Sequence, residues 1–430
     1  MMSIALLASC SDSDSDSGQP ANTPELTVNK TEVSIEGIGG ETTIEVSSSS
    51  TYTVTGGMGW VTATPADGNI KLKVEENLWQ KAREAVLTLT NSEQMSQAIT
   101  IKQEAQAYND NHHYKLPVIF HVLYYKDTDE KQYVREGHMG KLLDLVNKLY
   151  DNCGVNIPVD FVPVTHTPEG ELLPEPGVHR VKTKRSTYDP SMIMSGKTRE
   201  ISEMMWDPSR YINVFVTKFT EIAIAGISQF PILPEPYELA GMSQAKKGSN
   251  INANPYPQCV CINNEYIYEL PKSDNAYEMG DPSVTIAHEL GHFLGLKHAF
   301  NQTDNGQTNW NEDTDHCTDT EPYNKFAYDQ QLQQYLNTYG YITSKTSEAY
   351  GTYVMRIHSS TNKKFRSTNI MDYAVSDANR FTAQQNDRVR YVLHHGLYRP
   401  GPKDYSKAEI VEDPVTRQAE TNNFKPHFID

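Results

Sequence analysis

Residues 288–298 read HELGHFLGLKH, and this stretch decides the fold of the larger part of the 430-residue chain. His288 and His292 are four positions apart, so on a helix their imidazoles stand one turn apart on the same face. Gly295 can adopt the left-handed conformation that ends a helix. The chain then turns back, and His298 reaches the same point from outside the helix. The spacing therefore predicts three convergent histidines at the end of one helix.

Three neutral imidazoles make a metal site of the catalytic type, because they leave the fourth coordination position of zinc open. Zinc lowers the pKa of a bound water to ~7 and polarises a substrate carbonyl. Glu289 is placed to hold that water, to take its proton and to pass the proton to the leaving amine. The pattern thus predicts His288, His292 and His298 as zinc ligands and Glu289 as the general base.

The helix that carries these residues belongs to a domain of mixed elements. Asp281 is a good N-cap, and Pro282 suits the first helical position. A continuous apolar run over residues 116–124 predicts a buried strand, and a helix is expected near residues 139–152. Two shorter strands are expected over residues 212–216 and 259–262. Helices and strands mixed in this way predict an α/β or α+β domain.

The N-terminal part is predicted to be all-β. Its apolar residues alternate with a period of two in short runs, and turn clusters such as Gly37–Gly40 and Pro65–Gly68 separate the runs. Strands are expected over residues 26–28, 43–46, 52–54, 70–74 and 85–89. Short strands at this spacing predict a small β-sandwich.

The composition excludes one class of partner. Hydrophobic residues make up 37% and charged residues 22% of the chain, which is ordinary for a globular protein. The net charge of −17 argues against nucleic acid, because phosphate binding needs a basic face.

Four cysteines follow the N-terminal region, and two readings of them stay open. They either form disulfides, in one of three connectivities, or are buried free thiols. The four are Cys153, Cys259, Cys261 and Cys317. A histidine in the apolar strand, His121, is expected to be a core residue whose hydrogen bonds are satisfied.

The motif and the later run Asn369-Ile370-Met371-Asp372-Tyr373 together resemble the metzincin zinc peptidases. The resemblance implies that Met371, in the Met-turn, forms an apolar floor under the three histidines. It also implies that Tyr373 stabilises the oxyanion of the reaction intermediate. A tyrosine that only packs is the alternative.

The stretch from about Leu116 to Tyr398 resembles one metzincin family, the pappalysins. Besides the two motifs, the resemblance rests on residues 116–122, 226–231, 317–322 and 381–388, the last of which would open a C-terminal helix. One departure is the long segment Tyr323–Lys364, which is expected to hold an extra helix and to border the cleft.

Two expectations about substrate follow from this resemblance. Asp377, six residues beyond Met371, is expected at the base of the pocket for the side chain that follows the scissile bond. There it would favour Arg or Lys, because a carboxylate pairs well with a guanidinium. An extended peptide is expected along an edge strand near Cys259–Ile262, by strand addition.

A run of acidic residues follows the zinc motif and leaves a second metal open. Asp304, Asn305, Glu312, Asp313 and Asp315 are oxygen ligands of the kind that calcium prefers, and some pappalysins bind calcium. No EF-hand spacing is present, and a solvated acidic loop is the alternative.

The N-terminus is expected to be a processing signal. The apolar run Ile4–Ser9 is too short to span a bilayer. Leu7-Ala8-Ser9-Cys10 resembles a bacterial lipobox, which implies that Cys10 is lipidated. The Ser/Asp run over residues 11–18 resembles the export signals of surface lipoproteins. The resemblance implies a lipoprotein of the outer membrane that is exposed on the cell surface.

Residues 23–106, including Trp60, resemble the BACON module, an immunoglobulin-like domain. The resemblance implies either a spacer or a glycan contact, and Trp60 and Trp79 are as well explained as core residues. The expected organisation is therefore a signal and acidic tether (1–22), this sandwich (23–106), a metzincin catalytic domain (107–402) and a flexible tail (403–430).

The function expected from the sequence is that of a zinc endopeptidase acting on extracellular proteins or peptides. The alternative is a surface adhesin that binds glycan or host protein and whose metal domain is inert. The intact Glu289 argues against that alternative, because an inert site has no chemical need of it.

Overall fold

The structure is a computed structural model that describes residues 24–403 except 59, 75–76, 78–81, 105–112, 251–255, 302–313 and 374. The chain divides into two compact units. The smaller is built from residues between Leu26 and Lys102, and the larger mainly from Gln103 onward. Cys10, the acidic run, Trp79 and residues 404–430 lie outside the described residues. No helix among the described residues has the length and apolar character needed to cross a membrane.

The smaller unit consists of two four-stranded sheets. The first has the order β1 (Leu26–Val28), β3 (Gly40–Ser48), β6 (Asn69–Val74), β5 (Val61–Ala66). The second has the order β2 (Glu32–Ile35), β8 (Ser96–Gln103), β7 (Arg83–Asn91), β4 (Tyr52–Gly56). Buried and exposed residues alternate along β6 and β7, and apolar side chains from both sheets share one core. Trp60 is part of that core, as expected.

Three strands of this unit, β2, β5 and β8, were not expected from the sequence, and for β5 the reason is visible at Pro65. The expected turn Pro65–Gly68 begins too early, since β5 continues through Pro65 and only Asp67 and Gly68 turn. Because β5 is the last strand of its sheet, a residue without an N–H is tolerated there.

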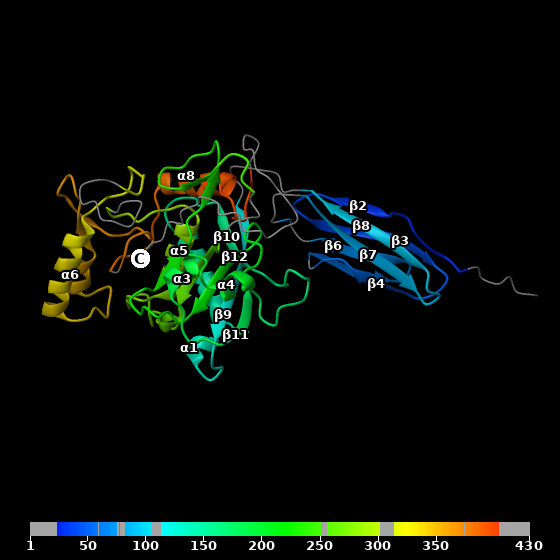
Figure 1. Ribbon diagram of the computed structural model, residues 1–430, viewed down its shortest axis with the longest axis horizontal. Coiled ribbons are helices and arrows are strands. Elements are labelled where there is room, and N and C mark those ends of the chain that lie inside the picture. Colours follow the sequence, from blue (N-terminus) through cyan, green and yellow to red (C-terminus); the bar gives the residue numbers. More distant parts are fainter. Residues whose placement is uncertain are drawn as a thin grey trace, which may run out of the picture. The chain divides into compact units, whose positions relative to one another are not determined.

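The larger unit is built on a mainly parallel sheet (Figure 1). Its order is β10 (Val159–Pro163), β9 (Tyr114–Tyr124), β12 (Ile212–Thr217), β16 (Cys259–Asn263), β13 (Gly226–Ser228), and β11 (Val178–Lys182) also pairs with β9. All pairs are parallel except β13 with β16. The remaining short strands are β14 (Ile232–Pro234), β15 (Ser243–Ala245), β17 (Met355–Ile357) and β18 (Lys364–Arg366).

The strand expected to receive substrate is not the edge strand. Residues 259–262 belong to β16, which is bordered on both sides by β12 and β13. The strand at the end of this order is β13, which has only three residues and runs antiparallel to β16. A strand this short carries no apolar period of its own, so the sequence pattern favoured its longer and fully buried neighbour.

Several helices complete the described part of this unit. They are α1 (Glu130–Tyr133), α2 (His138–Asp151), α3 (Pro190–Met194), α4 (Arg199–Met204), the short 3-10 helix η2 (Asn264–Tyr266), α5 (Pro282–Phe293), α6 (Lys325–Tyr339), α7 (Glu348–Tyr353) and α8 (Ala383–His395). The expected helix near residues 139–152 is α2. The expected C-terminal helix is α8, which Thr382 and Gln385 begin with a capping box. Lys403, the first residue of the expected tail, donates from Nζ to the Leu393 carbonyl at 2.7 Å, and the rest of that tail stays a prediction.

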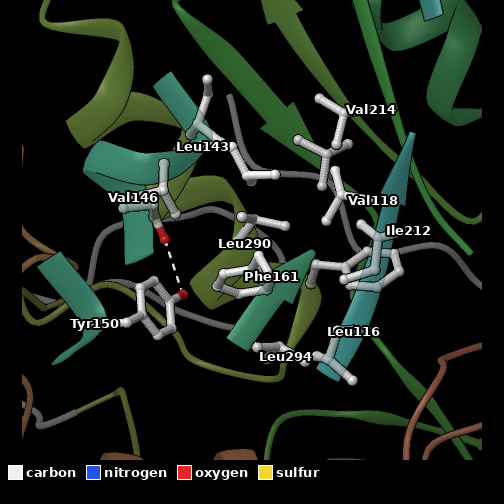
Figure 2. Packing of buried hydrophobic residues seen from close by; sticks show 14 of the residues in the cluster. Leu116, Val118, Leu143, Val146, Tyr150, Phe161, Ile212, Val214, Leu290 and Leu294 are labelled. Atoms are coloured by element: carbon white, nitrogen blue, oxygen red, sulfur yellow. Dashed lines mark hydrogen bonds between the residues drawn. The ribbon is translucent and has the colours of Figure 1, made fainter. Parts of the chain in front are cut away.

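In the main core of this unit, α5 packs against α2 and against β13 and β16, and α2 also contacts β10. Figure 2 shows Leu290 and Leu294 among the side chains of Leu143 and Val146 and those of the strands. The Tyr150 hydroxyl donates to the Ala287 carbonyl at 3.1 Å, so α2 also contacts the backbone of α5. Burial of these aliphatic side chains holds α5 in place, because each Å² of apolar surface removed from water contributes roughly 25 cal/mol of free energy.

The segment between His298 and Met371 contains more structure than one extra helix. Residues 323–366, called the inserted segment below, hold α6, α7, β17 and β18. In Figure 1, α6 lies at the far edge of this unit from the sheet. The inserted segment contributes Tyr323, Tyr328, Tyr350 and Tyr353 to a buried aromatic core that also contains Tyr277 and Phe300.

The four cysteines are buried free thiols. The Sγ atoms of Cys259 and Cys261 are 3.9 Å apart. His121 is fully buried, and its Nε2 lies 2.9 Å from Asn213 Oδ1 and its Nδ1 3.1 Å from His179 Nδ1. It is therefore the satisfied core histidine that the sequence suggested.

Candidate metal centre

Three histidines converge at the C-terminal end of α5. His292 Nε2 lies 2.9 Å from His288 Nε2 and 3.1 Å from His298 Nε2. Tetrahedral zinc with Zn–N bonds of 2.0–2.1 Å would separate such atoms by about 3.3 Å, close to these values. All three side chains are buried, and among the described residues they form the one group of three or more metal-ligating side chains.

The other ring nitrogens show which tautomer is present. His288 Nδ1 donates to the Ile370 carbonyl at 2.8 Å, and His292 Nδ1 donates to the Leu296 carbonyl at 2.7 Å. Because a carbonyl only accepts, each Nδ1 carries the hydrogen and each Nε2 presents a lone pair. Burial lowers the pKa of His288 to about 4 and that of His292 well below its usual value. Neutral rings with facing lone pairs repel one another unless a cation lies between them, so the residues fit a zinc ion.

The turn after α5 brings in the third histidine. Asp281 begins the helix by accepting from Ser283 N at 2.9 Å. Gly295 ends it with φ at +92°, and a side chain there would also meet Val392 at 2.6 Å. The expected left-handed glycine is therefore present. Beyond it, Ala299 N donates to the Met371 carbonyl at 3.1 Å, which ties the returning chain to the Met-turn.

Glu289 is buried beside the histidines with one oxygen still available. Its Oε2 atom has no hydrogen-bond partner in the structure. Burial raises the pKa of Glu289 to about 8, and a cation in the three-histidine site would lower it again. A Cβ on Gly226 would lie 2.6 Å from Glu289 Cγ, so β13 passes directly over this carboxyl group. Only glycine leaves room for that approach.

Met371 and Tyr373 both lie at the histidines. Met371 is fully buried, and a Cβ on Gly291 would lie 2.5 Å from its Sδ. Met371 therefore packs against the turn of α5 that joins His288 to His292. The Tyr373 ring centre lies 4.4 Å from that of His298 and 5.6 Å from that of His288. The structure thus brings the expected floor and the expected phenol to one place.

Asp377 has partners within the chain. Arg366 donates to both of its oxygens, from Nε at 2.6 Å and Nη2 at 3.0 Å, and the Tyr350 hydroxyl donates to Oδ1 at 2.8 Å. Although burial alone raises it, the bonds from Arg366 and Tyr350 lower the pKa of Asp377 below its usual value. The bidentate pairing expected with a substrate is therefore already made by Arg366.

The predicted calcium ligands fall mostly outside the described residues. Of the five, only Asp315 is described, and its oxygens accept from Cys317 N at 2.9 Å and Thr320 Oγ1 at 2.8 Å. Calcium binding by this loop stays a prediction.

Two arginines support the centre, and the sequence assigned neither of them a role there. Arg399 Nε donates to the Phe293 carbonyl at 2.8 Å, and Arg388 Nε donates to the Gly295 carbonyl at 3.1 Å. These cations satisfy carbonyls at the end of α5, where the helix dipole is negative. Both lie about 100 positions downstream of α5. Only position in space identifies them.

Three convergent imidazoles beside a buried carboxyl group form a donor set that could hold zinc, of the kind found in hydrolytic zinc sites. Residues 195–394 match the model of a peptidase family described as pregnancy-associated plasma protein-A. This match and the three-histidine group support a zinc-dependent metallopeptidase. No curated protein matches the chain significantly.

Solved structures share partial likeness with the chain. Mirolysin in complex with compound 9 is 19% identical, over 66% of this chain and 92% of that chain, with a TM-score of 0.41. A protein from Bacteroides thetaiotaomicron solved by NMR is 14% identical, over 23% and 100%, with a TM-score of 0.18. A Bacteroides ovatus xyloglucanase in complex with a heptasaccharide is 15% identical, over 47% and 39%, with a TM-score of 0.19. These TM-scores establish neither fold nor activity.

Proposed function

We propose that this chain is a zinc endopeptidase of the metzincin type that hydrolyses peptide bonds of extracellular proteins. The observation that carries the proposal is the set of three Nε2 atoms that face one another beside a buried carboxyl oxygen that lacks a partner. His288, His292 and His298 would hold the zinc. When bound, zinc supplies Lewis acidity that polarises the scissile carbonyl and makes a water molecule acidic near pH 7.

The chain's own residues then carry the proton and the charge. Glu289 takes a proton from the attacking water and gives it to the leaving amine. Its burial supports this role, because a carboxyl group in a dry site changes protonation near neutral pH. The Tyr373 phenol donates to the oxyanion that forms on the carbonyl. His288 and His292 stay neutral throughout and keep their Nδ1–H bonds to the backbone.

Substrate is proposed to bind along β13. This strand ends the order of the sheet and lies over Glu289 at Gly226. An extended peptide that pairs with β13 would place a backbone carbonyl near the zinc ligands, and strand addition does not depend on sequence. Choice among substrates would come from the pocket that contains Asp377, whose charge Arg366 compensates.

Outside the catalytic unit, we propose that Cys10 is lipidated and tethers the enzyme to the outer face of the outer membrane. Residues 23–106 would then be a BACON-like, immunoglobulin-like spacer. A Cys10→Ser protein should move from the membrane to the soluble fraction, and continued membrane association would exclude a lipid tether. A glycan array probed with the whole protein tests for sugar contact, and specific binding would replace the spacer role.

The proposed function is tested with Glu289→Gln. The variant should fold and bind one zinc ion, because the ligands remain. Its turnover number should fall by ~10²–10⁴-fold or more, because the general base is gone. Zinc content by elemental analysis is compared with cleavage of a peptide library, with and without a chelator. Near-normal turnover by the zinc-loaded variant would exclude this mechanism. A wild-type protein that binds zinc but cleaves no peptide would exclude the peptidase function.

A further inference from the structure

Arg356 is a buried cation within the inserted segment. It lies on β17, and its side chain has no exposed surface. Its Nη1 donates to the Tyr353 carbonyl at 2.9 Å, while its Nη2 donates to the Val375 carbonyl at 2.8 Å and to that of Tyr373 at 3.4 Å. The same Nη2 lies 3.3 Å from Asp372 Oδ2. One guanidinium therefore contacts three residues of the stretch that follows Met371.

The surroundings leave Arg356 little freedom. Its guanidinium carbon lies 3.5 Å from the centre of the Tyr328 ring and 5.1 Å from that of the Tyr323 ring. A buried charge is costly unless most of its donors meet acceptors, and the donors of the guanidinium form a rigid, planar fork in which Nη1 and Nη2 are bonded and Nε has no partner. The aromatic rings fix the plane of the guanidinium. The carbonyl groups and the Asp372 carboxylate that accept from it must therefore lie in that plane. Arg356 thus sets the position of the backbone after Met371.

Asp372 completes this anchor. It accepts from the Tyr323 hydroxyl and the Ser367 hydroxyl, and from Tyr373 N at 2.7 Å. Only 3% of its side-chain surface is exposed. Tyr323 and Arg356 belong to the inserted segment, and Ser367 directly follows it. The Arg356–Asp372 pair therefore joins that segment to the Met-turn.

Both backbone polar groups of Tyr373 are held by this pair. Its N–H goes to Asp372 and its carbonyl to Arg356. Its ring lies against His298, and the Phe300 ring centre is 4.9 Å away on another side. With both neighbouring peptide groups fixed, the direction in which the Tyr373 side chain leaves the backbone is fixed as well. Any tilt of these peptides would move the ring away from His298.

We propose that Arg356 is a positioning residue of the metal centre, which holds Tyr373 in place against the zinc ligands. This proposal rests on the proposed function, in which the Tyr373 phenol acts on the reacting carbonyl. It gives the inserted segment a role in catalysis at a distance. The competing explanation is that Arg356 only stabilises the aromatic core of the inserted segment.

The kinetic test is a double-mutant cycle between Arg356→Lys and Tyr373→Phe. Lysine keeps the charge and the apolar stem but is a point donor that cannot match the acceptors of the fork. Arg356→Lys alone should bind one zinc ion, keep KM within about twofold and lower kcat about tenfold. In the Tyr373→Phe background the same change should lower kcat less than about twofold, because the group that it positions is absent. Arg199→Lys, at an exposed ion pair with Glu203, is the matched control and should leave both constants unchanged.

A second readout needs no turnover. Zinc is replaced by cobalt(II), whose visible absorption reports changes around the three histidines. Arg356→Lys and Tyr373→Phe should each shift the spectrum, and the double variant should match Tyr373→Phe alone. Equal effects of Arg356→Lys in both backgrounds, or a raised KM with kcat unchanged, would overturn the proposal.

Two further outcomes keep the test decisive. If Arg356→Lys does not fold, Tyr323→Phe takes its place in the same cycle, since it removes one donor from Asp372 and keeps the ring. Coupling with Tyr373 again supports the proposal, and additivity overturns it. If the wild-type protein cleaves no peptide, the peptidase function fails, and the cobalt spectra still decide whether Arg356 positions Tyr373.

Discussion

Helix α5 and the inserted segment both contact the Met-turn, and they differ in how the sequence encodes them. Gly291 of α5 contacts Met371, while Arg356 of the inserted segment contacts Asp372. The residues of α5 and its following turn that form the centre lie within 11 positions, so their spacing alone predicts the site. The inserted segment acts through one arginine among aromatic residues, which has no local pattern. The comparison teaches that metal ligands can be read from periodicity, whereas the residues that hold the surroundings in place cannot.

The largest effect is expected where the local pattern is broken. His298→Ala removes one of three ligands, so it should weaken zinc binding by more than about 10²-fold, since loss of an outer contact to a ligand already costs 10–100-fold. Peptidase activity should become undetectable. Zinc titration against a chelating dye measures the zinc affinity, and peptide turnover measures the activity. His358→Ala, in the inserted segment, is the matched control. Retained zinc and turnover in His298→Ala would mean that the third ligand is another residue.

The next effect falls where the two regions meet. Tyr373→Phe should lower kcat about 10²-fold with zinc content and KM little changed, because an oxyanion donor acts in the transition state. Steady-state kinetics and metal analysis on the same sample measure this. Loss of zinc in parallel with activity would instead assign Tyr373 a structural role.

A smaller effect is expected in substrate preference. Arg366→Ala should free the Asp377 carboxylate and raise kcat/KM about tenfold for peptides with Arg or Lys after the scissile bond, relative to Leu. Asp377→Ala should remove any such preference and spare neutral peptides. The measurement compares peptides that differ at that position alone. An unchanged ratio in Arg366→Ala would place Asp377 outside the substrate pocket.

The last effect concerns stability rather than activity and lies outside both regions, at His121. Burial, the largest cause, and nearby His179 lower its pKa to about 3, against about 6.5 in the unfolded chain. The unfolded state therefore binds the extra proton first, so His121 contributes stability at neutral pH that is lost as the pH falls through this window. The loss is about 1.4 kcal/mol per pH unit below 6.5.

His121→Gln tests this dependence. Urea unfolding of zinc-loaded wild type and variant should show a difference in unfolding free energy that shrinks by about 2 kcal/mol between pH 7 and pH 5. A difference that is the same at both pH values would show that His121 does not carry this acid sensitivity.

Much of the architecture was predictable because local physics dominates there. The caps and the glycine at the ends of α5, the buried strand β9 and the capping box of α8 each leave a signature within a few residues. The failures share a cause. The edge strand β13 is too short to show a period, and β5 contains a proline that only an edge position tolerates. In both places, the neighbour in the sheet decides the structure.

The sequence by itself determined the three convergent histidines, the carboxyl group beside them and the turn that follows the helix, because helical geometry converts their spacing directly into positions. Only the tertiary structure decided that β13 covers Glu289 and that Arg366 pairs with Asp377. The same is true of the bond from Arg356 to the backbone carbonyl of Tyr373. These contacts join residues between 11 and 63 positions apart. Such pairs meet only when the folded core brings their backbones together, and burial then makes unpaired charges and carbonyls too costly to leave unmatched.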